Sequence, residues 1–197
     1  MSRNALIIVL FMAIGSCRPP VFPPKPSGYF KIDTPSSHQY RLFSREGFPY
    51  TFEYPVYTTI EDDTVFQSKD KHNPYWININ FPTLGGVINI TYKEISAEHP
   101  YMTLVAEADD LSFIHHQKAD YIDPYVFSFR DHNVSGILYT VGGNAATRYQ
   151  FTATDSVKHF FRGALYFNVT PNADSLKPAT DFVVKDIQHL LGTLRWK

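Results

Sequence analysis

The sequence predicts an α+β protein built on a single antiparallel β-sheet of about six to eight strands, arranged as a meander and packed with two main helices. Short segments rich in aromatic and β-branched residues alternate apolar and polar side chains and are joined by glycine-containing turns, as in hairpins. Two longer segments space their apolar residues by three and four, as amphipathic helices do. Aromatic residues make up 16% of the 197 residues, which suits strands because flat rings pack well on a pleated surface.

The chain begins with features of an exported lipoprotein. Arg3 precedes the apolar run Ala5 to Ile14, which is too short to span a hydrocarbon layer of about 30 Å as a helix. The residues Ile14-Gly15-Ser16-Cys17 resemble the lipobox at which bacterial lipoprotein signals are cut. We therefore predict a signal peptide over residues 1–16 and lipidation of Cys17, the only cysteine. The alternative is an ordinary cleaved signal with an incidental cysteine nearby.

A proline-rich stretch follows the cysteine. Residues 18–27 read RPPVFPPKPS, which favours extended polyproline II structure. We predict that residues 17–27 form a lipidated tether, able to hold the folded part about 30 Å from a membrane at about 3.1 Å per residue. A processed end without a spacing role is the alternative. Residues 28–197 are predicted to form a single α+β domain, since their number suits one hydrophobic core.

The first half of the predicted domain contains β-prone segments. Residues 29–57 hold short pieces broken by proline and glycine, which we expect to wrap or edge the sheet. Residues 60–74 are expected to be an exposed connection with one short strand around 64–67. The segments YWININF and VINITY then predict a hairpin with one buried side. Its inward residues are Ile77, Ile79, Phe81, Ile88, Ile90 and Tyr92.

Two helices are predicted by their apolar stripes. Ser96 is a plausible N-cap for a helix that runs to about Gln117, and Pro178 suits the first turn of a helix near the end of the sequence. The first stripe consists of Tyr101, Leu104, Ala108, Leu111 and His115, and the second of Val183, Ile187, Leu190, Leu191 and Leu194.

Between these helices the sequence predicts a meander of strands. YVFSFRD, VSGILYTV and AATRYQFTA are followed by HFFRGALYFNV, and the turn at Gly142–Asn144 supplies the positive φ that a hairpin needs. The last strand is apolar on both sides, with Gly163 as a possible bulge. Its two faces carry Leu165, Phe167 and Val169 on one side and Phe160, Ala164 and Tyr166 on the other.

When both faces of a sheet are apolar, each face must be packed against other elements of the chain or against a partner. Either two helices, or one helix and the N-terminal segment, bury both faces, or one face is free to dock a partner protein. In the second case Phe160, Arg162 and Tyr166 would form the partner surface, because an exposed aromatic patch usually marks an interaction site.

No catalytic or metal-binding pattern is found. Ser156 lies near Asp155 and His159, but three residues within one turn rarely aim at each other as a catalytic triad must. The net charge is −1, so the sequence predicts no basic surface that would bind nucleic acid. The sequence therefore predicts no enzyme, no cofactor and no metal site. None of the histidines stands at ligand spacing from another: His38, His72, His99, His115, His116, His132, His159 and His189.

Together with the lipobox cysteine, five segments of the chain resemble the gliding motility lipoprotein GldD family of Bacteroidota. The resemblance implies a role in gliding, a link to the envelope machinery of type IX secretion, and no established enzymatic activity. We therefore expect a scaffold or assembly factor in the cell envelope, anchored to a membrane through Cys17, with other gliding or secretion proteins as partners. The segments are Pro24–Ile32, Tyr50–Tyr57, Gly136–Ser156, Lys158–Leu176 and Asp181–Trp196.

Three further expectations accompany this resemblance. Bacteroidota glycosylate exported proteins at Asp-Ser/Thr-apolar motifs, so Thr64, Ser156 and Ser175, each in a predicted connection, are candidate O-glycosylation sites. The late strands followed by a helix resemble a PsbP-like sandwich, which is an analogy of fold alone. An alternative function is a periplasmic module that binds a small ligand or glycan between sheet and helix, in a deep aromatic-lined pocket with convergent polar groups.

Overall fold

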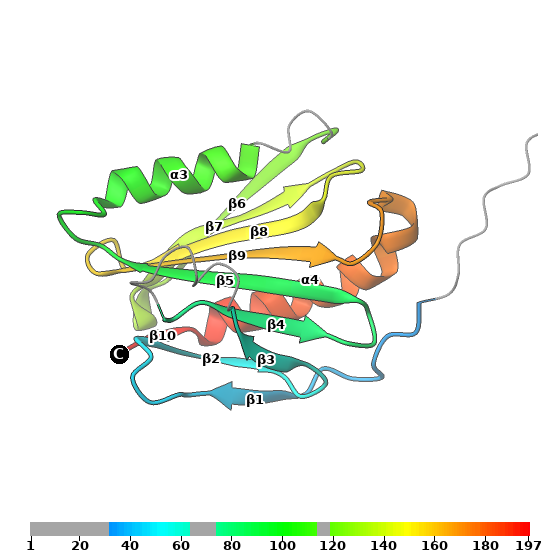
Figure 1. Cartoon of the computed structure of the whole chain (residues 1–197), viewed down its shortest axis with the longest axis horizontal. Helices are drawn as coiled ribbons and strands as arrows, with labels where there is room; N and C mark the ends of the chain where they lie inside the picture. Colours follow the sequence, from blue (N-terminus) through cyan, green and yellow to red (C-terminus); the bar gives the residue numbers. More distant parts are fainter. Residues whose placement is uncertain (1–31, 64–73, 114–118) are drawn as a thin grey trace, which may run out of the picture.

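A computed structural model describes residues 32–63, 74–113 and 119–197. Within these residues, a seven-stranded sheet and a three-stranded sheet pack with two helices (Figure 1). The main sheet has the order β3-β4-β5-β9-β8-β7-β6, and all of its neighbouring strands are antiparallel. The predicted α+β class and strand number are confirmed. The strands are β3 Thr59–Asp62, β4 Ile77–Phe81, β5 Gly86–Glu94, β6 Ile122–Phe129, β7 Val134–Val141, β8 Thr147–Thr154 and β9 His159–Phe167.

The predicted hairpin of β4 and β5 is confirmed. Ile77 lies opposite Ile90, and Ile79 lies opposite Ile88. Along each strand, buried residues alternate with half-buried ones. The meander is also confirmed, with a short 3-10 turn, η3 Arg130–His132, between β6 and β7. Strand β9 joins the two parts because it pairs with β8 on one side and along the whole of β5 on the other.

The N-terminal strands form a sheet of their own. Strand β1 (Tyr40–Phe43) pairs with β2 (Tyr50–Pro55), and β2 also pairs with β10 (Arg195–Trp196). The prediction of a single sheet is therefore wrong in this respect. The physical reason for the second sheet is a long-range pairing. Trp196 lies opposite Tyr50, and the periodicity of neither segment predicts that contact.

The first helix, α3, runs over Tyr101–Phe113 and starts later than predicted. Ser96 does not cap it, because the Ser96 hydroxyl oxygen accepts the His99 backbone N–H at 3.2 Å within a preceding turn. The first turn of the helix is instead closed at the Pro100 carbonyl, which accepts the N–H groups of Thr103 and Leu104. The end predicted near Gln117 and the stripe residue His115 lie outside the described residues.

The second helix, α4, runs over Ala173–Thr193 and starts five residues before Pro178. Asn172 is its N-cap: the side-chain oxygen accepts the Ser175 backbone N–H at 3.0 Å. Pro178 thus lies inside the helix rather than in its first turn, because a capping side chain was available further upstream. No helix of the described residues combines the length and the apolar character needed to cross a membrane.

Both faces of the main sheet are covered, as the first alternative predicted. One face packs on α4 and the β1-β2 pair in one large core, whereas α3 packs on the opposite face (Figure 1). On β9, Phe161 and Leu165 point into the large core and Phe160 points to α3.

Gly163 is not a bulge, and the irregularity of the sheet lies in β8 between Thr147 and Gln150 instead. Gly163 pairs regularly with Ile90 and Phe151. A Cβ at this position would lie 2.1 Å from the Phe151 ring, so the glycine makes room for a buried aromatic side chain. A glycine in a strand has this role where another group approaches closely.

Candidate functional site

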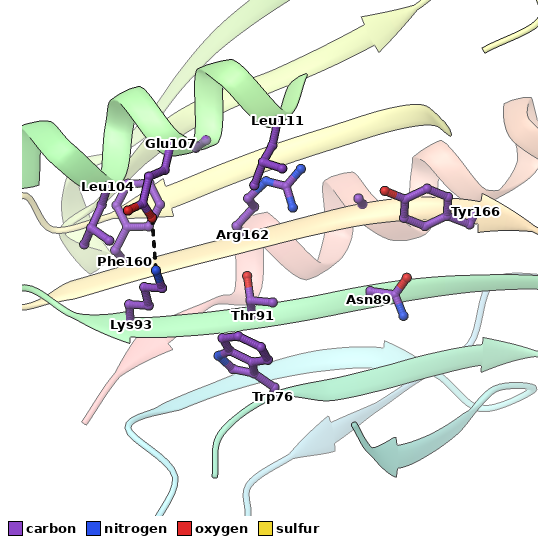
Figure 2. A pocket seen from close by; sticks show the side chains of 12 residues that line it. Trp76, Asn89, Thr91, Lys93, Leu104, Glu107, Leu111, Phe160, Arg162 and Tyr166 are labelled. Atoms are coloured by element: carbon purple, nitrogen blue, oxygen red, sulfur yellow. Dashed lines mark hydrogen bonds and ion pairs between the residues drawn. The ribbon is translucent and has the colours of Figure 1, made fainter. Parts of the chain in front are cut away.

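A cavity of about 510 Å³ lies between α3 and the strands β5 and β9 (Figure 2). Its volume falls within the range of small-molecule sites. The walls are mainly apolar, and a few polar side chains converge on the space from the sheet. The lining consists of Trp76, Asn89, Thr91, Lys93, Leu104, Glu107, Ala108, Leu111, Phe160, Arg162, Ala164 and Tyr166.

The periodicities of α3 and β9 create this lining. Helical residues three or four apart share a face, so α3 presents four of them to the cavity, whereas alternate residues of β9 present four others. Leu104 and Ala108 are buried against Phe160 and close one end. Leu111 belongs to the predicted apolar stripe but is 48% exposed, because α3 lies over the cavity at this residue and does not pack directly on the sheet.

Arg162 is a charged residue of the cavity wall that has no ion-pair partner among the described residues. Its Nη2 donates to Gln150 Oε1 at 2.7 Å, and Gln150 also accepts from Ser112 Oγ of α3 at 3.4 Å. Arg162 Nε is enclosed by protein and has no hydrogen-bond acceptor, and no carboxylate of a described residue lies within ion-pair distance. Burial lowers the pKa of the guanidinium, which nevertheless stays protonated because an arginine does not lose its proton in a protein.

An ion pair marks one side of the cavity. Lys93 Nζ of β5 donates to Glu107 Oε2 of α3 at 3.0 Å, and this contact ties the helix to the sheet (Figure 2). Both side chains are partly exposed, so the pair contributes about 0–1 kcal/mol to stability. It can therefore open at little cost.

The three residues predicted as a partner surface do lie together, but not on an exposed face. Phe160 is only 5% exposed, because α3 covers it, and Arg162 and Tyr166 are half-buried. The expectation of a free docking patch is corrected accordingly: Phe160, Arg162 and Tyr166 line the cavity. The two-faced strand selected these residues, and burial of this face by a predicted helix was the alternative to an exposed docking patch.

The group of Asp155, Ser156 and His159 has no catalytic geometry. Asp155 Oδ1 accepts the backbone N–H groups of Val157, Lys158 and His159 at 2.8–3.0 Å, and His159 Nδ1 lies 2.8 Å from the Tyr92 hydroxyl. Burial alone would raise the pKa of Asp155, but these three N–H groups lower it. The aspartate therefore shapes the β8–β9 turn.

The candidate modification sites differ in their surroundings. Ser156 is exposed in the β8–β9 turn with a φ of 64°, whereas Ser175 lies in the first turn of α4 and donates to the Asn172 carbonyl at 3.2 Å. The expectation that Ser175 lies in a connection is thus wrong, because Asn172 starts the helix upstream of it. Thr64 and Cys17, with the predicted signal peptide and tether, lie outside the described residues.

A buried carboxylate in the interior of α4 was not predicted. Asp186 is 2% exposed and accepts from Tyr40 at 3.0 Å and from Tyr57 at 2.5 Å, while His38 Nδ1 lies 2.7 Å from it. Burial and the adjacent carboxylate raise the pKa of both tyrosines, so both stay protonated as donors. Because Asp186 is enclosed, we assign this cluster to the attachment of the N-terminal segment to α4.

Metal binding has no geometric support in the described residues. Within residues 32–63, 74–113 and 119–197, no group of three or more histidine, cysteine, aspartate and glutamate side chains is arranged to hold an ion. Three of the described histidines, His38, His159 and His189, instead contact aromatic rings or carboxylates. His189 Nε2, for example, lies 2.6 Å from Glu53 Oε2, and its ring stacks on Tyr40.

The chain was compared with known families, curated protein sequences and solved structures. None of the curated protein sequences matches the chain. Among solved structures, the solution structure of cyanobacterial PsbP (CyanoP) from Synechocystis sp. PCC 6803 is similar, with a TM-score of 0.44 and 13% sequence identity, over 88% of this chain and 100% of that one. The model of the family described as gliding motility lipoprotein GldD matches residues 20–196, and the chain therefore belongs to that family.

Proposed function

We propose that this gliding motility lipoprotein is a non-enzymatic component of the cell envelope that holds an apolar group in the cavity beneath α3. The observation that supports this proposal is the cavity itself, with aromatic and aliphatic walls and polar side chains converging from β5 and β9. Ligand sites combine these features. A catalytic site would need a general base or nucleophile in position, but Glu107, the acidic residue of the lining, is paired with Lys93.

Filling the cavity should stop gliding without removing the protein from the envelope. Ala164 lies on the cavity floor, so Ala164→Leu places three additional carbon atoms in the space that a ligand would occupy. We expect cells with this variant to lose most of their movement over a surface, measured as the speed of single cells. The matched control is Ala106→Leu, the same substitution at an exposed position of α3, which should glide at the normal speed.

Thermal unfolding of both purified variants separates loss of function from loss of fold. Normal gliding of Ala164→Leu cells with an intact, folded protein would contradict the proposed use of the cavity.

The proposal includes a lipid anchor at Cys17. Membrane retention by two or more acyl chains is effectively stable, so Cys17→Ser should move the protein from the membrane fraction to the soluble fraction and abolish gliding. Fractionation of the envelope followed by immunoblotting measures the first effect. The control is Ser16→Ala, which keeps a small residue before the cysteine; a Cys17→Ser protein that stays in the membrane would overturn the anchor.

A second candidate function is a scaffold that works through protein contacts within the gliding and type IX secretion machinery. It is favoured by β6, one of the two edge strands of the main sheet, where the adjacent residues Tyr125 and Val126 are both exposed. An exposed edge strand can pair with a strand of another protein. If Val126→Lys stops gliding while Ala164→Leu does not, this second function replaces the first.

A further inference from the structure

We propose that the cavity beneath α3 takes a single-chain amphiphile with an anionic head group, in which Arg162 binds the head and the apolar wall holds the chain. This inference rests on the proposed function, because it names the chemical class of the group that the cavity would hold. A fatty acid is the simplest member of the class, and an acyl chain that ends in a phosphate shares its chemistry.

The charge of Arg162 indicates the head group. Arg162 is half-buried, and within the described residues its guanidinium donates a hydrogen bond to Gln150, a neutral side chain. A buried cation without a counter-ion is costly, and it is compensated when an anion supplies charge-assisted hydrogen bonds. Within the described residues no carboxylate does so, since Glu107 is engaged with Lys93. An anionic ligand would therefore supply the counter-ion and the hydrogen-bond acceptors that the described residues do not give Arg162.

The wall indicates the body of the ligand. Leu104, Ala108 and Phe160 form a continuous apolar surface at one end of the cavity, and Leu111 extends it along α3. Burial of methylene groups against such a surface contributes about 0.8 kcal/mol for each group. A glycan would instead need hydrogen-bonding groups along its length, which these side chains do not offer. The wall thus favours an alkyl chain over a carbohydrate.

Access to the cavity does not require unfolding. The Lys93–Glu107 pair joins α3 to β5 at the edge of the cavity, and both of its side chains reach solvent. A surface ion pair exchanges readily with water, so it can separate while the buried contacts of α3 with β9 persist.

The test measures binding of lipids to the full chain carrying Cys17→Ser, which removes the predicted acylation site and allows work without detergent. A dansylated undecanoic acid is the fluorescent probe, and palmitate, methyl palmitate and hexadecyltrimethylammonium are the competitors. We expect palmitate to displace the probe, and Arg162→Gln to raise the dissociation constant of palmitate at least about tenfold. Methyl palmitate, which lacks the charge, should bind the variant and the parent protein equally.

Two further variants locate the site. Ala164→Leu should abolish binding of both palmitate and its ester, because it fills the cavity. Arg148→Gln is the matched control: Arg148 lies on β8 outside the cavity lining, donates to the Val141 carbonyl at 3.0 Å and, like Arg162, has an enclosed Nε without an acceptor. Its affinity for palmitate should be unchanged.

The outcomes separate this inference from the proposed function. If Arg162→Gln binds palmitate as tightly as the parent protein while Ala164→Leu binds neither lipid, the head-group assignment is overturned and the cavity remains a ligand site. Preference for hexadecyltrimethylammonium over palmitate would overturn the assignment as well. If the parent protein binds no probe at all, both the inference and the proposed function fail.

Discussion

Replacement of Asp186 by alanine should lower the free energy of unfolding by about 3–5 kcal/mol. The carboxylate is enclosed between α4 and the N-terminal segment, and it satisfies the hydroxyl groups of Tyr40 and Tyr57 and the ring nitrogen of His38. Its removal takes the acceptor from three partly buried polar groups, and a buried group left without its partner costs up to about 1–3 kcal/mol. Denaturant-induced unfolding, followed by tryptophan fluorescence, measures the change.

Asp181→Ala is the control for this prediction. Asp181 lies on the same helix but is exposed, and it pairs with Lys177 one turn away. Exposed pairs of this kind contribute about 0.3–0.5 kcal/mol, so the control should unfold almost like the parent protein. Equal stability of the two variants would mean that the Asp186 cluster does not hold the N-terminal segment to α4.

Replacement of Phe161 by alanine should be about as damaging, with an expected loss of about 3–5 kcal/mol. The side chain is fully buried at the point where the two sheets meet, and its ring centre lies 5.0 Å from that of Tyr50 and 6.2 Å from that of Phe151. The cost includes the lost transfer free energy and the cavity that the neighbours fail to fill. The midpoint of denaturant unfolding, at unchanged slope, measures it.

Phe113→Ala provides the same substitution at a site that is 50% exposed, the last residue of α3. It should change stability by less than about 1 kcal/mol. A Phe161→Ala protein as stable as this control would show that the ring does not belong to the common core of the two sheets.

Much of the fold is predictable because its signals are local. The alternation of Ile77, Ile79 and Phe81 decides which face of β4 is buried whatever the rest of the chain does, and the same is true of β5. The stripe of α4 likewise marks its buried face, with Val183 and Ile187 fully enclosed. Periodicity therefore predicted these elements and their inward sides.

The element boundaries and the second sheet depend on competing or distant contacts. Both Ser96 and Asn172 have a side chain that can cap a helix, but Ser96 is used in a turn, and only the three-dimensional path of the chain decides between such uses. The pairing of β2 with β10 joins segments whose own patterns are too short to be informative. A two-residue strand has no periodicity to read.

The candidate site was predictable in its residues but not in its form. The two apolar faces of β9 drew attention to Phe160, Arg162 and Tyr166, and these do gather around one space. The distance between α3 and the sheet decides whether this face is exposed, tightly packed or left with a cavity. That distance depends on the volumes of side chains from several elements. The Asp186 cluster was not predicted for a similar reason, since Asp186 lies more than 100 residues from each of its three partners.

The pairing of β2 with β10 also sets an order of events during synthesis. Thr51 and Tyr50 find their partners only when Arg195 and Trp196 have been made, after every residue of the main sheet and of α4. Until then β2 lacks one of its two neighbouring strands. Pairing between segments so far apart in the sequence is slow. The three-stranded sheet is therefore completed only after the rest of the described fold has been synthesised.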